Sequence, residues 1–412
     1  MKKSYLILLA AVCAFTACKN DDFLGTVKSE TPAAEQQIAF STFNNKMTKA
    51  ENSTENTKIS LLQHHADFSV WALKDNETAK WVFQGTKVEG KDDNGTITWE
   101  PVDVRFWDKT ATRYDFYAAA PAAAAWKLNG ATVASDHDKG YFTLADVTLA
   151  DVTLDSATYQ ESMKEQANID YMIASDKYVE QAAFGQEVDL DFNHILSRLN
   201  VTVKRGPSLE KWAKDNSSKA EYAKVTLTSL QVVKMLSKGS FDESKVSGTD
   251  LQNGTTGRWT TTNDVINYTA CITNATDLKN SPEVYVLQSL VMPQTVKYEA
   301  INAGTGKKAA DATDAAETYV CVKFNIGTES YTTYVNLAAA FGAKEDDTAT
   351  ADIDESLIAF NEGWQNTLRI TIDASAITFT ANAYNWEDGA DSNYTIETAI
   401  NIPTNLDIVD NN

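Results

Sequence analysis

Short strand-like runs, many with alternating apolar and polar residues, follow one another along the chain, and long helical periodicity is nearly absent. The runs include Asp67–Leu73, Val104–Trp107, Val188–Phe192 and Leu199–Lys204. A period of two places side chains of one kind on one face of a β-strand. Asp92-Asp93-Asn94-Gly95 indicates a hairpin turn, because Asn-Gly accepts the positive φ values of a two-residue loop. The pattern predicts an all-β fold of antiparallel β-sandwiches.

A break in this pattern suggests two domains in tandem. Arg205-Gly206-Pro207 interrupts the strands, and a polar stretch follows to about Glu221. The strand pattern then resumes. A length of 412 residues fits about two domains of 100–200 residues each. We therefore expect an N-terminal β-sandwich over 38–205 and a C-terminal β-sandwich over 206–390.

Two strand-like segments lie at the ends of this arrangement. The first is Ile38–Phe43, which leads through Lys46 and Lys49 into a polar stretch that we expect to be exposed and accessible to proteases. The second is Tyr394–Ile402, within the tail 391–412. It carries apolar residues on one face, and Pro403 ends it; these residues are Ile396, Ile400 and Ile402. Such a one-faced segment is suited to pairing with an open sheet edge.

The N-terminal residues have the layout of a secretory signal peptide. Lys2 and Lys3 precede the uncharged apolar run Tyr5–Phe15, which is too short for a membrane-spanning helix. Small residues then precede Cys18, as in a bacterial lipobox. We expect a signal peptide over 1–17 and a lipidated tether over 18–37. Lys19-Asn20-Asp21-Asp22 resembles an acidic tag for the outer face of the outer membrane; an ordinary signal with an incidental cysteine is the alternative.

Charge and cysteine content narrow the function further. Lys and Arg total 36 and Asp and Glu total 57, so the net charge is −21. This charge argues against a nucleic-acid partner, because phosphates would be repelled. Outside the signal and Cys18, only Cys271 and Cys321 remain. They could pair in an oxidising compartment or be buried free thiols.

The candidate chemical residues favour a structural protein over an enzyme. We interpret His64-His65 and Asp136-His137-Asp138 as polar loops, His194 as a capping or core residue, and the acidic stretch 346–355 as a solvated loop without calcium-loop spacing. No phosphate-binding, dinucleotide, zinc-protease or serine-hydrolase motif occurs, so we predict no catalytic residue, no metal and no cofactor. Five tryptophans could stack on sugars or form core: Trp71, Trp99, Trp107, Trp126 and Trp259.

Taken together, several stretches resemble the fimbrillin family, the lipoprotein-derived subunits of type V pili. The resemblance covers almost the whole chain and rests on Phe68–Ala72, Trp99, Phe106-Trp107, Tyr114–Ala118, Pro121, Val188–Val203, Gly239–Phe241, Met292–Gln294 and Ile377–Trp386. It implies two transthyretin-like β-sandwich domains. It also implies that a protease clips the subunit after the first strand, and that a neighbour's tail strand then fills the groove.

The resemblance thus implies a surface fimbrial subunit that polymerises with other subunits and supports adhesion and biofilm formation. Its candidate clip sites are Lys46 and Lys49, and its lipid would bind the outer membrane through Cys18. The family often uses arginine at the clip site, yet no Arg precedes Arg105, so an Arg-specific protease is excluded there. The alternatives are a fimbrial tip or anchor subunit, or a monomeric glycan-binding surface lipoprotein; the ligand would lie on a host or bacterial surface.

Overall fold

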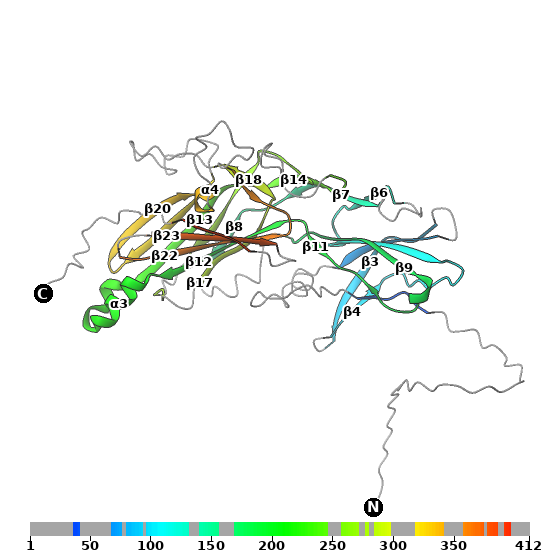
Figure 1. Ribbon diagram of the computed structural model, residues 1–412, viewed down its shortest axis with the longest axis horizontal. Helices are drawn as coiled ribbons and strands as arrows, with labels where there is room; N and C mark the ends of the chain where they lie inside the picture. Colours follow the sequence, from blue (N-terminus) through cyan, green and yellow to red (C-terminus); the bar gives the residue numbers. More distant parts are fainter. Residues whose placement is uncertain are drawn as a thin grey trace, which may run out of the picture. The chain divides into compact units, whose positions relative to one another are not determined.

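Short strands, paired mainly antiparallel, build the fold, as the alternating pattern predicts (Figure 1). The computed structural model describes residues 36–41, 67–75, 80–93, 96–131, 140–155, 169–245, 257–271, 277–279, 284–297, 318–341, 357–374, 377–385 and 391–396. The prediction of an all-β fold is confirmed. The transthyretin-like detail stays an expectation. Residues 36–412 cluster into a single unit by their contacts.

An eight-stranded mixed sheet forms from the first half of the described chain, in the order β10-β1-β4-β3-β2-β5-β9-β11. Its strands are β1 (Phe40–Ser41), β2 (Phe68–Lys74), β3 (Lys80–Asp93), β4 (Thr96–Pro101), β5 (Arg113–Ala120), β9 (Met172–Glu180), β10 (Val188–Asp189) and β11 (Asn193–His194). Asp93 pairs with Thr96, so the predicted hairpin between β3 and β4 is confirmed. Val104–Trp107, expected as a strand, contributes only an isolated bridge from Phe106 to Gln37.

Two five-stranded sheets form mainly from the second half of the described chain, in the orders β17-β12-β22-β23-β24 and β20-β19-β13-β16-β8. The first contains β12 (Ser197–Arg205), β17 (Val284–Val291), β22 (Trp364–Ile372), β23 (Ile377–Asn385) and β24 (Asp391–Ile396). The second contains β8 (Val152–Asp155), β13 (Val225–Leu236), β16 (Val265–Cys271), β19 (Tyr319–Ile326) and β20 (Glu329–Asn336).

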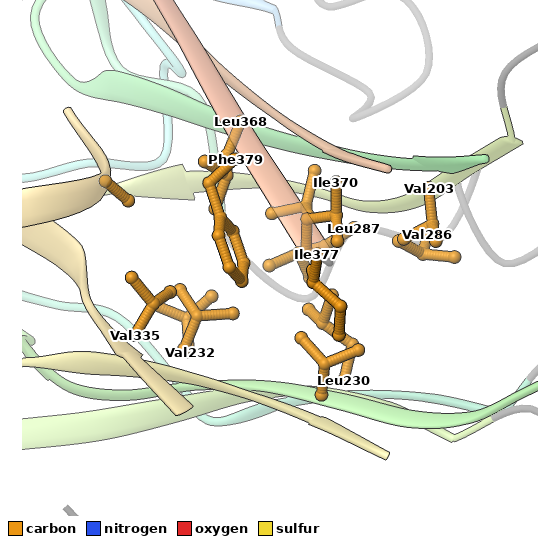
Figure 2. Packing of buried hydrophobic residues seen from close by; sticks show 14 of the residues in the cluster. Val203, Leu230, Val232, Val286, Leu287, Val335, Leu368, Ile370, Ile377 and Phe379 are labelled. Carbon is orange, nitrogen blue, oxygen red and sulfur yellow. The ribbon is translucent and has the colours of Figure 1, made fainter. Parts of the chain in front are cut away.

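Apolar side chains from both five-stranded sheets meet in one core. Figure 2 shows Leu368, Ile370 and Phe379 of the first sheet facing Leu230 and Val232 of the second. All five are fully buried. Alternation along each strand sends these residues to the inner face of their sheet. Two sheets that bury one face against each other make a β-sandwich.

Two smaller sheets are also present, and the larger one joins residues from both sides of the predicted domain boundary. One has the order β15-β14-β7-β6 and the other pairs β18 with β21. Their bounds are β6 (Lys127–Asn129), β7 (Tyr141–Thr148), β14 (Lys238–Asp242), β15 (Trp259–Thr261), β18 (Gln294–Lys297) and β21 (Leu357–Phe360). Because β7 pairs with β14 and β8 pairs with β16, sheets on the C-terminal side include strands from before residue 206. The domain division stays a prediction.

A helix follows the predicted boundary where the sequence suggested only a polar stretch. It is α3 (Pro207–Asp215), and its first residue is a proline. Proline suits this position because its fixed φ matches a helix and its missing N–H would have no partner there. The Asp373 carboxylate accepts hydrogen bonds from the backbone N–H groups of Ser208 and Leu209. Shorter helical segments are η1 (Gln181–Ala183), η2 (Ser217–Ala223) and α4 (Leu337–Ala340).

Candidate functional site

The first strand is an insert between two segments that come much later in the chain. On one side, the N–H of Ile38 donates to the Arg105 carbonyl at 2.8 Å, and Trp107 N–H donates to Gln36. On the other side, the N–H groups of Val188 and Leu190 donate to the carbonyls of residues 39 and 41 at 2.8 Å. β1 is therefore parallel to β10 and antiparallel to β4. We call the space that residues 36–41 fill the β1 slot.

Two side chains of this segment enter the core of the eight-stranded sheet. Ile38 is 0% exposed and Phe40 is 3% exposed, whereas the residues before and between them are not buried. The Phe40 ring lies 5.7–6.1 Å, centroid to centroid, from three rings, those of Phe68, Phe83 and Phe116. Aromatic pairs at this separation are favourable. The segment predicted as the first strand thus places two apolar side chains, two residues apart, in the core.

After the β1 slot, the next described residue is Asp67. No described residue lies between Ser41 and Asp67, so the candidate clip sites Lys46 and Lys49 fall outside the described residues. Cys18 falls outside them as well. What the structure describes is the strand before these lysines and the strand after them. Both are buried parts of the same sheet.

The predicted donor segment starts inside the C-terminal sandwich. β24 is the outermost strand of its sheet and pairs antiparallel with β23. Its last residue, Ile396, is the partner of Phe379 in this register. Ile400 and Ile402 lie outside the described residues. The first three residues of the predicted segment, 394–396, are therefore part of the chain's own sheet edge.

Four of the five tryptophans that could either stack on sugars or form core are part of the core. Trp99, Trp107, Trp126 and Trp259 are all at most 8% exposed, which favours the core interpretation over sugar stacking; Trp71 is half-buried against Phe142. A rim of exposed tryptophans would have favoured a glycan-binding surface. These five tryptophans therefore favour a core role over sugar binding.

Two chemically reactive residues are also buried. Cys321 is a free thiol inside its sheet, and burial raises its pKa. This favours the free-thiol alternative over a disulfide for Cys321. His194 is a core residue, as expected, with Nδ1 2.8 Å from the Asp170 carboxylate. Neither residue lies in the β1 slot.

A buried arginine is the strongest charged feature that the sequence did not indicate. Arg205, at the end of β12, donates from Nε to the Glu210 carboxylate at 2.8 Å and lies 3.4 Å from Asp277. Its guanidinium holds the pKa of Glu210 below the usual range. This pairing ties α3 to the sheet. A lone Arg before Gly-Pro gives no sequence signal for it, because the partners are set by the fold.

An exposed apolar segment also lies beside the slot. It is 102–106, which carries Val102, Val104 and Phe106 outside the core. The sequence did contain the signal, since these residues recur at every second position, but it was interpreted as a strand.

Across the described ranges, no group of three or more His, Cys, Asp or Glu side chains could hold a metal ion. No helix in that part of the chain is long and apolar enough to cross a membrane.

The described part of the chain is an all-β fold whose short first strand lies between β4 and β10 of its sheet. The sequence profile described as fimbrillin-like matches residues 46–407. The chain belongs to this fimbrillin-like family, whose members are fimbrial proteins of the cell surface. No curated protein matches the chain.

Three solved structures illustrate the likeness. A candidate cell adhesion protein from Bacteroides uniformis is 15% identical, with a TM-score of 0.40 over 85% of this chain and 98% of its own. A fimbrial assembly protein from Parabacteroides distasonis is 10% identical, with a TM-score of 0.32 over 87% and 99%. The tip fimbrial protein Mfa3 from Porphyromonas gingivalis, truncated at its C-terminus, is 10% identical, with a TM-score of 0.34 over 78% and 95%.

Proposed function

We propose that the chain is a structural subunit of a cell-surface fimbrium that polymerises by donor-strand exchange and supports adhesion and biofilm formation. The observation that carries the proposal is the β1 slot. Residues 36–41 have hydrogen-bonded neighbours on both sides and send two apolar side chains into a core. Release of this segment would leave an open sheet edge with a hydrophobic groove, which is the form that accepts an added strand.

The tail has the chemistry to fill this groove. Ile400 and Ile402 are two residues apart, as are Ile38 and Phe40, so both pairs place their side chains on one face of a strand. Ile396 is the end of β24, and the residues after it continue from an outer sheet edge. A neighbour's tail could therefore leave its own sheet at residue 396 and enter the slot. The partners would be other fimbrial subunits, in a homopolymer or a mixed fibre.

Processing would convert the precursor into the accepting form. We propose a cut after Lys46 or Lys49 by a lysine-cleaving protease, because both residues follow β1 and no Arg precedes Arg105. Before the cut, lipid on Cys18 would hold the exported lipoprotein at the outer membrane. After the cut, the subunit would be held in the fibre by its neighbours.

Two alternatives differ from a stalk subunit in specific ways. An anchor subunit would keep its lipid and its first strand, and a tip subunit would have no need to donate a tail. The tail after β24 favours a donating subunit. A monomeric glycan-binding lipoprotein is less favoured, because four of the five candidate tryptophans are buried. None of these alternatives is an enzyme.

N-terminal sequencing of surface-sheared material tests the proposal. A start at Met47 or Ala50 is the expected result, because it places the cut between the slot segment and β2. A lipid-blocked Cys18 in assembled material would instead identify an anchor or a monomeric lipoprotein. Replacement of Cys18 by Ala should remove metabolic labelling with a fatty acid, and labelling that persists would refute the lipidation site.

A further inference from the structure

A bulge in the segment opposite β1 pushes an apolar stretch to the surface. Between the Phe40–Trp99 pair and the Gln37–Phe106 bridge, the first segment has two residues (38 and 39) and the opposite one has six (100–105). Extra residues in one of two antiparallel segments interrupt their hydrogen bonding and turn side chains away from the partner segment. We call residues 102–106 the slot-side bulge.

The slot-side bulge exposes three large apolar side chains at every second position. Val102 is 56% exposed, Val104 is 45% exposed and Phe106 is 46% exposed. Trp107, the next residue, is buried. Within the described part of the chain, seven large hydrophobic residues are exposed to this degree, and three of them lie in these five positions. Clustered exposure of this kind marks an interaction site, whereas single exposed residues are ordinary.

The bulge is held in place independently of β1. Val102 N–H donates to the Lys87 carbonyl at 3.0 Å, and the Arg105 guanidinium donates to the Val82 carbonyl at 3.2 Å. Both acceptors belong to β3. The Arg105 carbonyl accepts from Ile38, so the bulge is also continuous with the slot. A strand that replaced β1 would take over this hydrogen bond and lie directly beside the exposed stripe.

We infer that the slot-side bulge binds residues 404–409 of the tail of a second copy, beyond the strand that fills the slot. The inference rests on the proposed strand exchange. Residues 397–402 match the six residues of the slot in number. The following residues contain a second apolar pair two positions apart, Leu406 and Ile408. This spacing matches that of Val102 and Val104.

Chain length allows this contact for either direction of the donated strand. The seven residues 403–409 span about 23–25 Å when extended, at about 3.3–3.6 Å per residue. The six-residue slot is about 20 Å long by the same measure. The apolar pair therefore reaches the bulge from whichever end of the slot the tail leaves. Pro403 separates the two parts and has no N–H to pair in the sheet.

Peptide binding to an open slot tests the inference. The acceptor is the chain ending at Ile396, with a specific protease site placed between residues 46 and 50 and cut in the folded protein. Its partners are synthetic peptides of residues 394–402 and 394–412. The longer peptide should have a Kd at least about tenfold lower, which corresponds to about 1.4 kcal/mol. Calorimetry or fluorescence anisotropy measures both values.

Matched variants separate the bulge from the slot. In a Val104→Ser, Phe106→Ser acceptor, the advantage of the longer peptide should disappear while the shorter peptide binds as before. A longer peptide with Leu406→Ser and Ile408→Ser should bind like the shorter one. Equal binding of both peptides to the unmodified acceptor would overturn the inference and leave strand exchange intact. Binding of neither peptide would instead refute strand exchange, and weaker binding of the shorter peptide to the bulge variant would show damage to the slot.

Discussion

Truncation of Phe40 should destabilise the precursor and leave the assembled form unaffected. Phe40 is 3% exposed and lies against three aromatic rings. Removal of a buried Phe side chain costs about 3–5 kcal/mol through lost burial and the cavity that remains. Phe40 lies on a two-residue strand whose partners stay in place, so we expect about 3 kcal/mol for Phe40→Ala.

The stability lost in Phe40→Ala should depend on which strand occupies the slot. In the uncut chain, Phe40 fills the groove, and the full cost applies. After cleavage and exchange, a neighbour's tail occupies the groove and residue 40 is no longer part of the fold. The free energy of unfolding of the exchanged form should therefore be the same for the variant and the unmodified chain. This difference between forms is specific to a strand that is replaced.

Urea unfolding of both forms, followed by tryptophan fluorescence, measures the effect. At an m value of about 3 kcal/mol/M, the uncut variant should unfold at a urea concentration about 1 M lower. Phe379→Ala is the control, because Phe379 is equally buried but belongs to the C-terminal core. It should destabilise both forms alike. An equal loss for Phe40→Ala in both forms would refute the replacement of β1.

Three further predictions concern the clip site, the tail and the Arg205–Glu210 pair. Replacement of both Lys46 and Lys49 by Ala should block the cut and the ladder of polymers on a gel without a change in the circular dichroism spectrum; normal ladders would place the cut elsewhere. Deletion of 397–412 should stop polymerisation but keep the unfolding midpoint, because β24 ends before it; polymers that persist would exclude the tail as donor. Glu210→Gln should lower the free energy of unfolding by about 1–2 kcal/mol at pH 7, because Arg205 loses a charged partner. This loss should shrink as the pH falls through the lowered pKa of Glu210. A loss that is the same at every pH in urea titrations at pH 3–7 would contradict this pairing.

Local alternation was sufficient to predict most strands of the fold but not their partners. The predicted strand Leu199–Lys204 lies within β12, whereas only Val188–Asp189 of the predicted strand Val188–Phe192 forms one. Leu190 and Phe192 are buried beyond it. The parallel pairing of β12 with β22 joins residues more than 160 positions apart. Period-two alternation contains no information about such partners, since it describes only which face is apolar.

The errors came from places where tertiary contacts override local signals. Gly206-Pro207 was interpreted as a break, but Asp373 accepts the first N–H groups of a helix that begins there. Val104–Trp107 was interpreted as a strand, but a bulge leaves it with one bridge. The candidate site was predictable in part: the sequence identified the first strand, whereas its position between β4 and β10 required the fold.

The strand directions of the C-terminal sheet determine how a subunit would respond to tension. A pull on the slot is transmitted through β10 and the short connection at Ile195-Leu196 to the start of β12, and a pull on the tail acts at the end of β24. β24 is parallel to β12, because two antiparallel steps follow the parallel β12–β22 pair. The two forces therefore act at opposite ends of the sheet. Every ladder between them is loaded in shear, so its hydrogen bonds share the load at once and do not open one by one.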